Sequence, residues 1–407
     1  MSGEKIYEGV FAVHKPTGIS SADVLRDLQK HFNPSALFKP WMDSERERRN
    51  RESNFQRRRR RSQRLDVKIG HGGTLDPMAT GVLVAGVGKG TKYLQNFLGC
   101  TKTYETVILF GAETDTYDRM GKIVRRGPYE HVTREAVEKA LEQFRGKIMQ
   151  HPPIFSALKV QGKKLYEYAR EGKEPPIEIK ARPVEVTNLE IVEWYEPGTH
   201  EYKWPEEEMV GEERAVAERL LAKDDALPAV PSVDDVDLEK GEQGAPLKRK
   251  PSAAGEEVAP TTESASDPST TADPAPSAKK QKVSAEEESV EVEKQSVQMD
   301  ETKSAEPGAD STTANRPPPP AVKLTMTVSS GFYVRSLAHD LGKALGTCGI
   351  MSSLIRSRQA TFELHPDKVL EYADLEAGED VWGPKVKGFL DEWEKKRAAE
   401  EDANDQA

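Results

Sequence analysis

Cysteine, long apolar runs and paired histidines are scarce in this chain of 407 residues. The two cysteines, Cys100 and Cys348, indicate neither a disulfide framework nor a zinc site. The eight histidines form no H-x-x-x-H pair, and no Ser-His-Asp or Cys-His signature favours a hydrolase. No run approaches the ~18 apolar residues of a membrane span, and the first residues resemble neither a signal peptide nor an Arg-rich presequence. We therefore expect an intracellular protein without membrane, metal or cofactor.

Charge is distributed unevenly along the chain, whose overall net charge is −10. Residues 1–195 hold 34 basic against 25 acidic side chains, a net charge of +9, and residues 321–362 hold 5 against 1, a net charge of +4. Residues 196–320 hold 14 against 29, and residues 363–407 hold 6 against 14. The two basic segments suit an anionic partner such as nucleic acid.

Strand-like and helix-like segments alternate irregularly over residues 6–195. Ser20, Ser21 and Thr133 are candidate N-caps for two helical runs of apolar residues. The β-type runs read "GVFAVHKP", "GVLVAGVG", "TYETVILFG" and "PVEVTNLEIVEWY". Because there is no strict βαβ alternation, we predict an α+β fold.

The pattern breaks off at residue 196. Pro, Ser, Thr, Ala and acidic residues dominate to residue 320, which predicts a disordered acidic insertion, and 36% hydrophobic content fits an unfolded part. A strand and a helix follow within residues 321–362, and we expect that strand to join the sheet of residues 1–195, since long surface insertions cost little loop-closure entropy. Residues 363–407 are predicted to form an acidic, helical C-terminal extension.

A second insertion is predicted at about residues 38–65. It carries ten arginines between Arg46 and Arg64. Two interpretations compete: a solvated linker or charged exposed helix, and an electrostatic arm for phosphates. The basic flanking segments favour the arm.

The stretch "GHGGTLDPMATGVLV", residues 70–84, places Asp76 between glycines and an apolar run. An aspartate in a turn before proline is usually structural. Here, however, the loop lies between two apolar runs, where catalytic groups are often placed. A carboxylate there needs a charged partner, and Arg335, near the start of an apolar helix, is the best candidate because a guanidinium pairs bidentately. Gly86, Gly88 and Gly90 lack Walker spacing, which favours a tight turn over a phosphate loop.

Six motifs, in order, resemble those of the TruB-type tRNA pseudouridine synthases. They are "HKPTGISS", "GHGGTLDPMATGVLVAGVGKGTK", "KTYE", "GAETDTYDRMGKI", "HPPIFSALKVQGKKLYEYAREG" and "SSGFYVRSLAHDLGKALG". The resemblance covers residues 10–195 and 321–362. It implies a mixed, mainly antiparallel pseudouridine synthase sheet with flanking helices. The additional insertions resemble the eukaryotic, fungal-like branch that modifies uridine 55 of the tRNA T-loop.

The resemblance implies four catalytic residues: Asp76, Tyr104, Arg335 and Asp118. Asp76 matches the catalytic aspartate, acting as nucleophile at ribose C1′ or as base toward a glycal; both routes require an ionised carboxylate and a flipped-out uridine. Tyr104 matches the tyrosine that stacks on the base and takes part in proton removal at C5. Arg335 matches the arginine that pairs with the aspartate, and Asp118 the acid that orients this arginine. We expect the Asp–Arg–Asp arrangement to lower the pKa of both acids.

The resemblance also implies contacts with RNA. His71 matches a histidine that contacts the substrate, Lys15 and Lys92 match basic positions near phosphate, and Leu354 matches an apolar residue near the pocket. Phe332 departs from the motif, where a small hydroxyl residue is common, and we expect this to alter packing. The tail of ~45 residues is too short for the RNA-binding domain of bacterial relatives.

The leading hypothesis is therefore an isomerase that converts uridine to pseudouridine in the T-arm of tRNA, as a monomer without an obligatory protein partner. The alternatives are a non-catalytic RNA-binding or folding protein and a guide-RNA-dependent pseudouridine synthase subunit. Two basic runs in the acidic insertion, at residues 246–252 and 276–284, resemble nuclear import signals. We expect a nuclear location, with the cytoplasm and the mitochondrion as further compartments.

Overall fold

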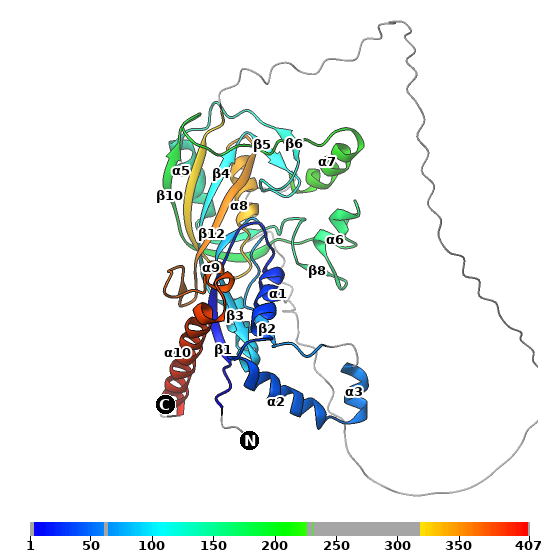
Figure 1. The fold of residues 1–407 in the computed structure, drawn as a ribbon. Helices are drawn as coiled ribbons and strands as arrows, with labels where there is room; N and C mark the ends of the chain where they lie inside the picture. The colour runs from blue at the N-terminus through cyan, green and yellow to red at the C-terminus, as the bar shows by residue number, and fades with distance from the viewer. Residues whose placement is uncertain (1–3, 61–63, 226–229, 231–317, 406–407) are drawn as a thin grey trace, which may run out of the picture. The chain divides into compact units, whose positions relative to one another are not determined.

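The computed structural model describes residues 4–60, 64–225, 230 and 318–405 (Figure 1). The two basic runs at residues 246–252 and 276–284, and most of the predicted insertion, lie outside the described residues. Within the described part of the chain, no helix is both long and apolar enough to cross a bilayer.

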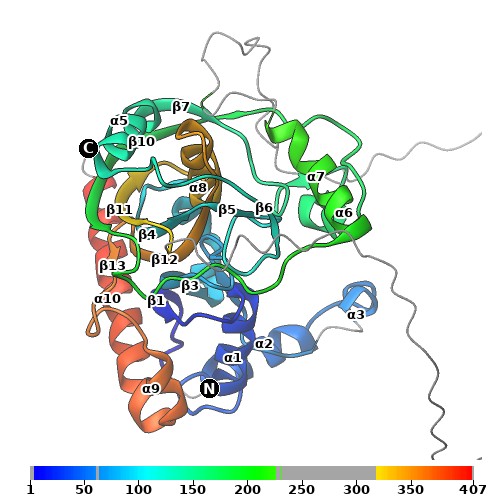
Figure 2. The same ribbon diagram turned by 90° about the horizontal axis from the view of Figure 1, so that it is seen from above.

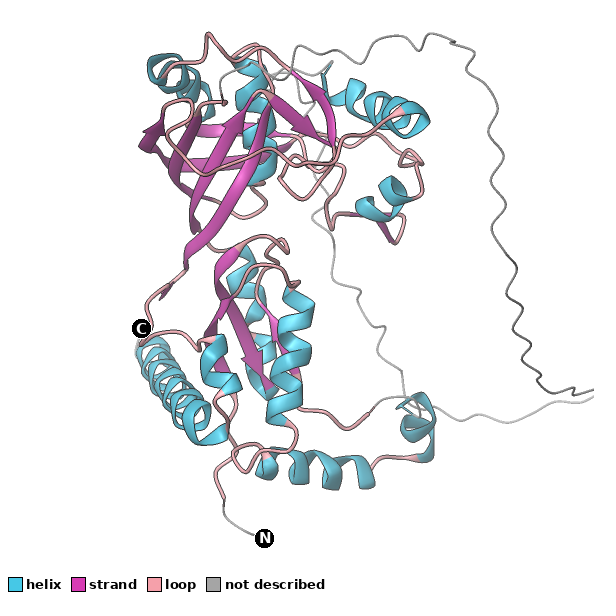
Figure 3. Ribbon diagram, turned by 45° about the horizontal axis from the view of Figure 1, so that its top comes forward, coloured by secondary structure: helices cyan, strands magenta, loops and turns pink. Residues whose placement is uncertain are grey.

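A mixed sheet forms the centre of the fold, with strand order β1-β3-β12-β4-β11-β10-β7 (Figure 3). Neighbouring strands are antiparallel except β3 and β12, which pair in parallel over two residues each. Short strands β2 and β13 pair with β3 and β12. The strands are β1 (Gly9–Lys15), β2 (Ile69–His71), β3 (Thr80–Val87), β4 (Lys102–Phe110), β7 (Gly146–Gln150), β10 (Arg182–Tyr195), β11 (Ala321–Val328), β12 (Gly349–Gln359) and β13 (Phe362–Glu363). The α+β prediction is confirmed.

Helices and two small hairpins complete the described fold. The helices are α1 (Ser21–Phe32), α2 (Lys39–Asn50), α3 (Asn54–Arg60), α4 (Leu94–Gly99), α5 (Arg134–Leu141), α6 (Leu165–Arg170), α7 (Gly211–Asp225), α8 (Val334–Ala344), α9 (Tyr372–Glu376) and α10 (Glu379–Asp405). The 3-10 helices are η1 (Gly88–Lys92) and η2 (Glu142–Phe144), and the hairpins pair β5 (Ala112–Thr114) with β6 (Ile123–Arg126) and β8 (Lys159–Val160) with β9 (Lys163–Lys164). Ser20 and Thr133 cap α1 and α5 as predicted.

Strand β11 lies inside the sheet, between β4 and β10, although it follows the insertion in sequence. It pairs with β4 from Ala321↔Leu109 to Val328↔Lys102, and its alternating residues Val322, Leu324 and Met326 are fully buried. The predicted joining of this strand to the first part of the sheet is confirmed.

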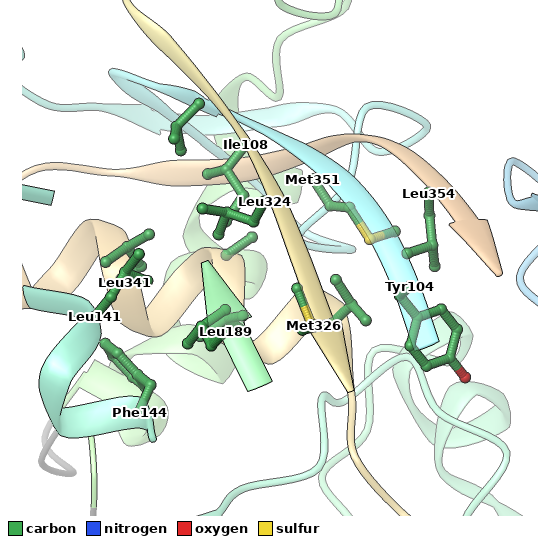
Figure 4. Close-up of a cluster of buried hydrophobic side chains, with 14 of the residues drawn as sticks. Tyr104, Ile108, Leu141, Phe144, Leu189, Leu324, Met326, Leu341, Met351 and Leu354 are labelled. Carbon is green, nitrogen blue, oxygen red and sulfur yellow. The ribbon is translucent and has the colours of Figure 1, made fainter. Parts of the chain in front are cut away.

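Two large clusters of apolar side chains stabilise the two ends of the sheet. One lies between β4, β10 and β11 and helices α5 and α8 (Figure 4). The other joins β1, β3 and α1 to the C-terminal helices α9 and α10, and Phe38 and Trp41 connect α2 to it. The C-terminal tail is thus part of the core rather than an independent extension.

The tail contributes its largest side chain, Trp382, to the second cluster. Trp382 is 1% exposed and its ring centroid lies 4.9 Å from that of Phe32. Trp382→Ala should lower the free energy of unfolding by about 3–5 kcal/mol, because it removes a packed ring and leaves a cavity. Urea denaturation measures this, and Val381→Ala, at a neighbouring side chain that is 41% exposed, is the control. Equal midpoints for both variants would contradict the assignment of α10 to the core.

The predicted insertion does not begin at residue 196. Residues 196–225 are described and end in α7, which lies beside α6 (Figure 2). Met209, Ala217 and Leu221 are buried with Tyr117 and Val124 of the β5–β6 region. The acidic composition concealed the apolar pair at positions i and i+4 that holds α7 on the fold.

Candidate active site

A loop of eight residues, 72–79, connects β2 to β3 and carries Asp76, as predicted. Its backbone carbonyl groups are bound from beneath by side chains of four other segments. Gln359 donates to Gly72 O (2.6 Å), Arg356 to Gly73 O (3.1 Å) and Thr74 O (3.4 Å), Ser21 to Leu75 O (3.1 Å), Thr17 to Met78 O (2.9 Å), and Lys15 to Pro77 O (3.0 Å) and Ala79 O (2.6 Å). The loop is therefore held by direct hydrogen bonds along most of its length.

Lys15 is fully buried beneath this loop. Its ammonium group also donates to Pro16 O at 2.8 Å, so three carbonyl oxygens surround it. Burial lowers the pKa of Lys15 to about 8, against the opposing effect of Asp76. The predicted phosphate contact of Lys15 is incompatible with this position, because the amine is enclosed and bonded to backbone. Lys15 therefore stabilises the Asp76 loop by donating hydrogen bonds to its backbone carbonyl groups.

Arg356 is the second buried cation below the loop, and sequence reasoning missed it. It is 1% exposed, and its Nε donates to Val82 O at 2.7 Å in addition to the two loop carbonyls. Its own backbone lies against Gly81, where a Cβ atom would come within 2.3 Å of Arg356 O. Glycine at position 81, with φ of +107°, lets β3 and β12 approach each other at the point where the loop ends.

Asp76 and Arg335 form a bidentate ion pair, as predicted. Arg335 Nε lies 2.8 Å from Asp76 Oδ2 and Arg335 Nη2 lies 3.0 Å from Asp76 Oδ1. The arginine side chain is 7% exposed, whereas that of Asp76 is 31% exposed. The two remaining hydrogen bonds of Arg335 go to Thr116 O (3.2 Å) and Phe155 O (3.0 Å). The carboxylate is therefore held rigidly from one side and accessible from the other.

Asp118 lies on the buried side of this pair, with Oδ2 3.7 Å from Arg335 Nε. Its Oδ1 accepts from Thr116 Oγ1 (2.8 Å) and from Met120 N–H (2.9 Å). Burial raises the pKa of Asp118, and this outweighs the lowering effect of Arg335. The expectation that the arginine lowers the pKa of both acids is therefore wrong for Asp118.

Behind the ion pair, Tyr117 and His339 connect α8 to the β5–β6 hairpin. Their rings stack with centroids 4.2 Å apart, and His339 Nδ1 lies 2.7 Å from Glu113 Oε1. Tyr117 has a φ of +60°, which places its carbonyl against β12 and its neighbours against Arg335. Sequence reasoning missed His339, although its position four residues after Arg335 puts both on one face of α8.

Tyr104 lies on β4, opposite Met326 of β11 and Arg356 of β12. It is 8% exposed and belongs to the same apolar cluster as Leu75 of the Asp76 loop and as Leu354. Figure 4 shows the Tyr104 ring and Leu354 at one end of that cluster, with the Tyr104 hydroxyl group at its edge. Phe332 packs against the cluster, consistent with an effect on packing.

The remaining predicted RNA contacts are the side chains of His71 and Lys92. His71 is half-buried at the end of β2 and accepts from Gly73 N–H at 3.4 Å; burial, and then Arg356, lower its pKa. Lys92 is exposed at the end of η1, so that β3, about 25 Å long, lies between it and the Asp76 loop. Gly90 packs directly on Gly9, where a Cβ would lie 1.9 Å from Gly9 O, which supports a close turn rather than a phosphate loop. Within the described ranges, no group of three acidic, histidine or cysteine side chains could hold a metal ion.

Comparisons with known proteins place this geometry in a family. The model of the TruB family pseudouridylate synthase (N terminal domain) matches residues 58–205. A tRNA pseudouridine synthase 4 of Schizosaccharomyces pombe is 38% identical, over 91% of this chain and 83% of that protein. A tRNA pseudouridine synthase 4 of Saccharomyces cerevisiae is 31% identical, over 94% of this chain and 85% of that protein. A solved archaeal box H/ACA sRNP Nop10-Cbf5 complex matches with a TM-score of 0.41 and 15% identity, over 94% of this chain and 59% of that chain. With two relatives above 30% identity along most of their length, this chain belongs to the TruB family of pseudouridine synthases.

Proposed function

We propose that this chain isomerises uridine to pseudouridine in tRNA, and that its target is uridine 55 of the T-loop. Membership of the TruB family and two relatives named tRNA pseudouridine synthase 4 support the reaction and the substrate. The observation that carries the proposal for the site is the bidentate pair of Arg335 with a partly exposed Asp76. This pair presents a carboxylate in a fixed position to a flipped-out nucleotide.

The reaction breaks the bond between N1 of uracil and C1′ of the ribose and forms a bond between C5 and C1′. In one route, a carboxylate oxygen of Asp76 attacks C1′ and displaces the base; in the other, the carboxylate removes a ribose proton and a glycal forms. After the base has turned, C5 bonds to C1′; in the first route the bond between C1′ and the Asp76 oxygen breaks, and in the second the ribose regains the proton that it gave to Asp76. C5 then loses its proton and N1 gains one. Atoms and charge balance without an oxidant or reductant.

The described side chains divide this work. Arg335 orients Asp76, and its two hydrogen bonds to backbone carbonyl groups fix the conformation of its own side chain. Asp118 orients Arg335 from the buried side. Tyr104 stacks on the base and assists removal of the C5 proton, a role that its place beside the Asp76 loop cluster supports. His71 contacts the substrate RNA and Leu354 borders the pocket.

An unmodified T-arm hairpin tests the proposal against its alternatives. The purified chain should form pseudouridine in this hairpin without any added RNA. Binding without product would favour a non-catalytic RNA-binding protein. Product that depends on an added guide RNA would favour a guide-dependent subunit.

The variant Lys15→Met distinguishes a structural role of Lys15, as support of the Asp76 loop, from a contact with RNA phosphate. We expect the rate of pseudouridine formation to fall by about 10–100-fold, because the Asp76 loop loses a support and shifts. The affinity for tRNA and its dependence on salt should remain unchanged. Lys92→Met is the matched control, because this lysine is exposed. Loss of a phosphate contact there would reduce the slope of log K against log salt by about 0.9 and leave the rate of pseudouridine formation unchanged. A flatter salt dependence of tRNA binding by Lys15→Met would contradict the structural role of Lys15.

A further inference from the structure

The arginine-rich segment consists of two helices that differ in charge. Residues 43–52, which include most of α2, contain four arginines and four carboxylates, so their net charge is zero. Residues 53–65, which include α3, contain six arginines and no acidic residue. The positive charge of the segment is therefore concentrated in its second half.

Ion pairs within residues 43–52 account for the four arginines of this stretch. Arg49 Nε lies 3.0 Å from Glu45 Oε1, Arg48 Nη1 lies 3.2 Å from Glu52 Oε1, and Arg51 Nη2 lies 3.6 Å from Glu47 Oε2. Arg46 pairs with Asp43. These pairs at positions i and i+3 or i+4 are those expected of a solvent-exposed charged helix. A phosphate that approached α2 would have to displace a carboxylate for each arginine.

Helix α3 differs from residues 43–52 in composition, because it contains no acidic residue. Its sequence, NFQRRRR, ends in four successive arginines, residues 57–60. The segment therefore carries four successive positive charges with no acidic residue among them. Arg57 and Arg60 are like charges at positions i and i+3, which destabilises an isolated helix. A polyanion removes this repulsion, whereas burial in the protein would increase it.

Helix α2 connects α3 to the folded core. Phe38 and Trp41 at the start of α2 are buried in the cluster around β1 and α1, and Trp41 Nε1 donates to Glu8 Oε1 at 2.9 Å. Arg57 Nη2 donates to Asn50 O at 2.6 Å, which joins the two helices. Figures 1 and 2 both show α2 running away from the sheet with α3 at its far end. Arg60, the last residue of α3, precedes Asp76 by 16 residues, which limits the separation of their Cα atoms to roughly 55 Å.

We propose that α3, and not α2, is a second RNA-binding surface, which contacts backbone phosphates of the tRNA substrate outside the target loop. This inference rests on the proposed function for its choice of polyanion. The contact is electrostatic and independent of sequence, because a run of positive charges attracts phosphates without reading base edges. It supplies affinity and does not take part in the reaction.

Salt titration of tRNA binding tests the surface. In the full chain, arginines 57–60 are changed to glutamine, and fluorescence anisotropy of unmodified tRNA gives the dissociation constant between about 50 and 200 mM salt. Loss of about two phosphate contacts, the number that one side of the helix can make, should reduce the slope of log K against log salt by about 2 and weaken binding by at least about tenfold at the lower salt concentrations. Changing the same four residues to lysine should restore both values.

Two further variants locate the effect. Neutralising α2 as a whole, with Arg46, Arg48, Arg49 and Arg51 changed to glutamine and Asp43, Glu45, Glu47 and Glu52 changed to their amides, should leave the slope unchanged. Pseudouridine formation at saturating protein should be normal in the α3 glutamine variant, and an unchanged melting temperature shows that it folds. An unchanged slope and affinity in that variant would overturn the proposal and favour an acidic protein as the partner of α3. If wild type binds tRNA through α3 yet forms no pseudouridine, the proposed function fails and this surface stands.

Discussion

Replacing Asp76 by asparagine should reduce the rate of pseudouridine formation by about 10⁴-fold or more, as loss of a residue that forms or breaks bonds does in other enzymes. The amide cannot attack C1′ or accept a ribose proton at neutral pH. It also turns an N–H group toward a guanidinium that now donates to two carboxylate oxygens 2.8 and 3.0 Å away. Both routes of the reaction therefore stop with the same substitution.

Binding should survive this change. Asp76 is 31% exposed and its loop is held by other side chains, so the path of the backbone does not depend on the carboxylate. Single-turnover assays on a T-arm hairpin, together with anisotropy of the same hairpin, measure rate and affinity separately. Asp367→Asn makes the same chemical change at a side chain that is 90% exposed and should alter neither value. Substantial turnover by Asp76→Asn would refute the assignment.

Replacing Arg335 by methionine should affect both folding and activity. Arg335 is surrounded by Asp76, Asp118 and two carbonyl groups, and its side chain is 7% exposed. Both acids raise the pKa of Arg335, against the lowering effect of burial. Removing one partner of a buried charge network leaves the others unpaired, which costs about 3–5 kcal/mol of folding free energy. Asp76 also loses the group that orients it, so activity should fall below detection.

Three further variants serve as comparisons for Arg335→Met. Arg335→Lys keeps the charge but cannot bond Asp76 bidentately, so it should regain most of the stability and little of the activity. Asp118→Asn should have the milder effect on rate, since Asp118 lies 3.7 Å from Arg335 Nε and the Asp76 pair stays intact. Arg214→Met breaks the ion pair with Glu218 on the surface of α7, where both side chains are 48% exposed, and should cost at most about 1 kcal/mol. Urea denaturation that ranked Arg335→Met with Arg214→Met would contradict the buried network.

The sequence predicted the elements whose signals are local. Ser20 and Thr133 begin helices because their side chains accept backbone N–H groups, and alternation in residues 321–328 predicted β11. Local signals also exist for the packing of α10 and α7 on the fold. Trp382, Val386 and Leu390 repeat every four residues in α10, and Ala217 and Leu221 do so in α7, but acidic composition outweighed these patterns.

The site depends on contacts that local signals do not contain. Asp76 and Arg335 are 259 residues apart, and only the ordered series of motifs linked them. Lys15 and Arg356 bind backbone carbonyl groups, which every residue possesses, so no residue type marks their partners in the sequence. A lysine in a motif therefore suggested phosphate, whereas the fold uses it beneath the loop.

Position-resolved pseudouridine mapping on full-length unmodified tRNA tests the central claim most directly. Wild-type chain, without cofactor or added RNA, should convert uridine 55 and no other uridine, and Asp76→Asn should leave this position unchanged while still binding the tRNA. Modification at a different position, or modification of uridine 55 by Asp76→Asn, would contradict the account.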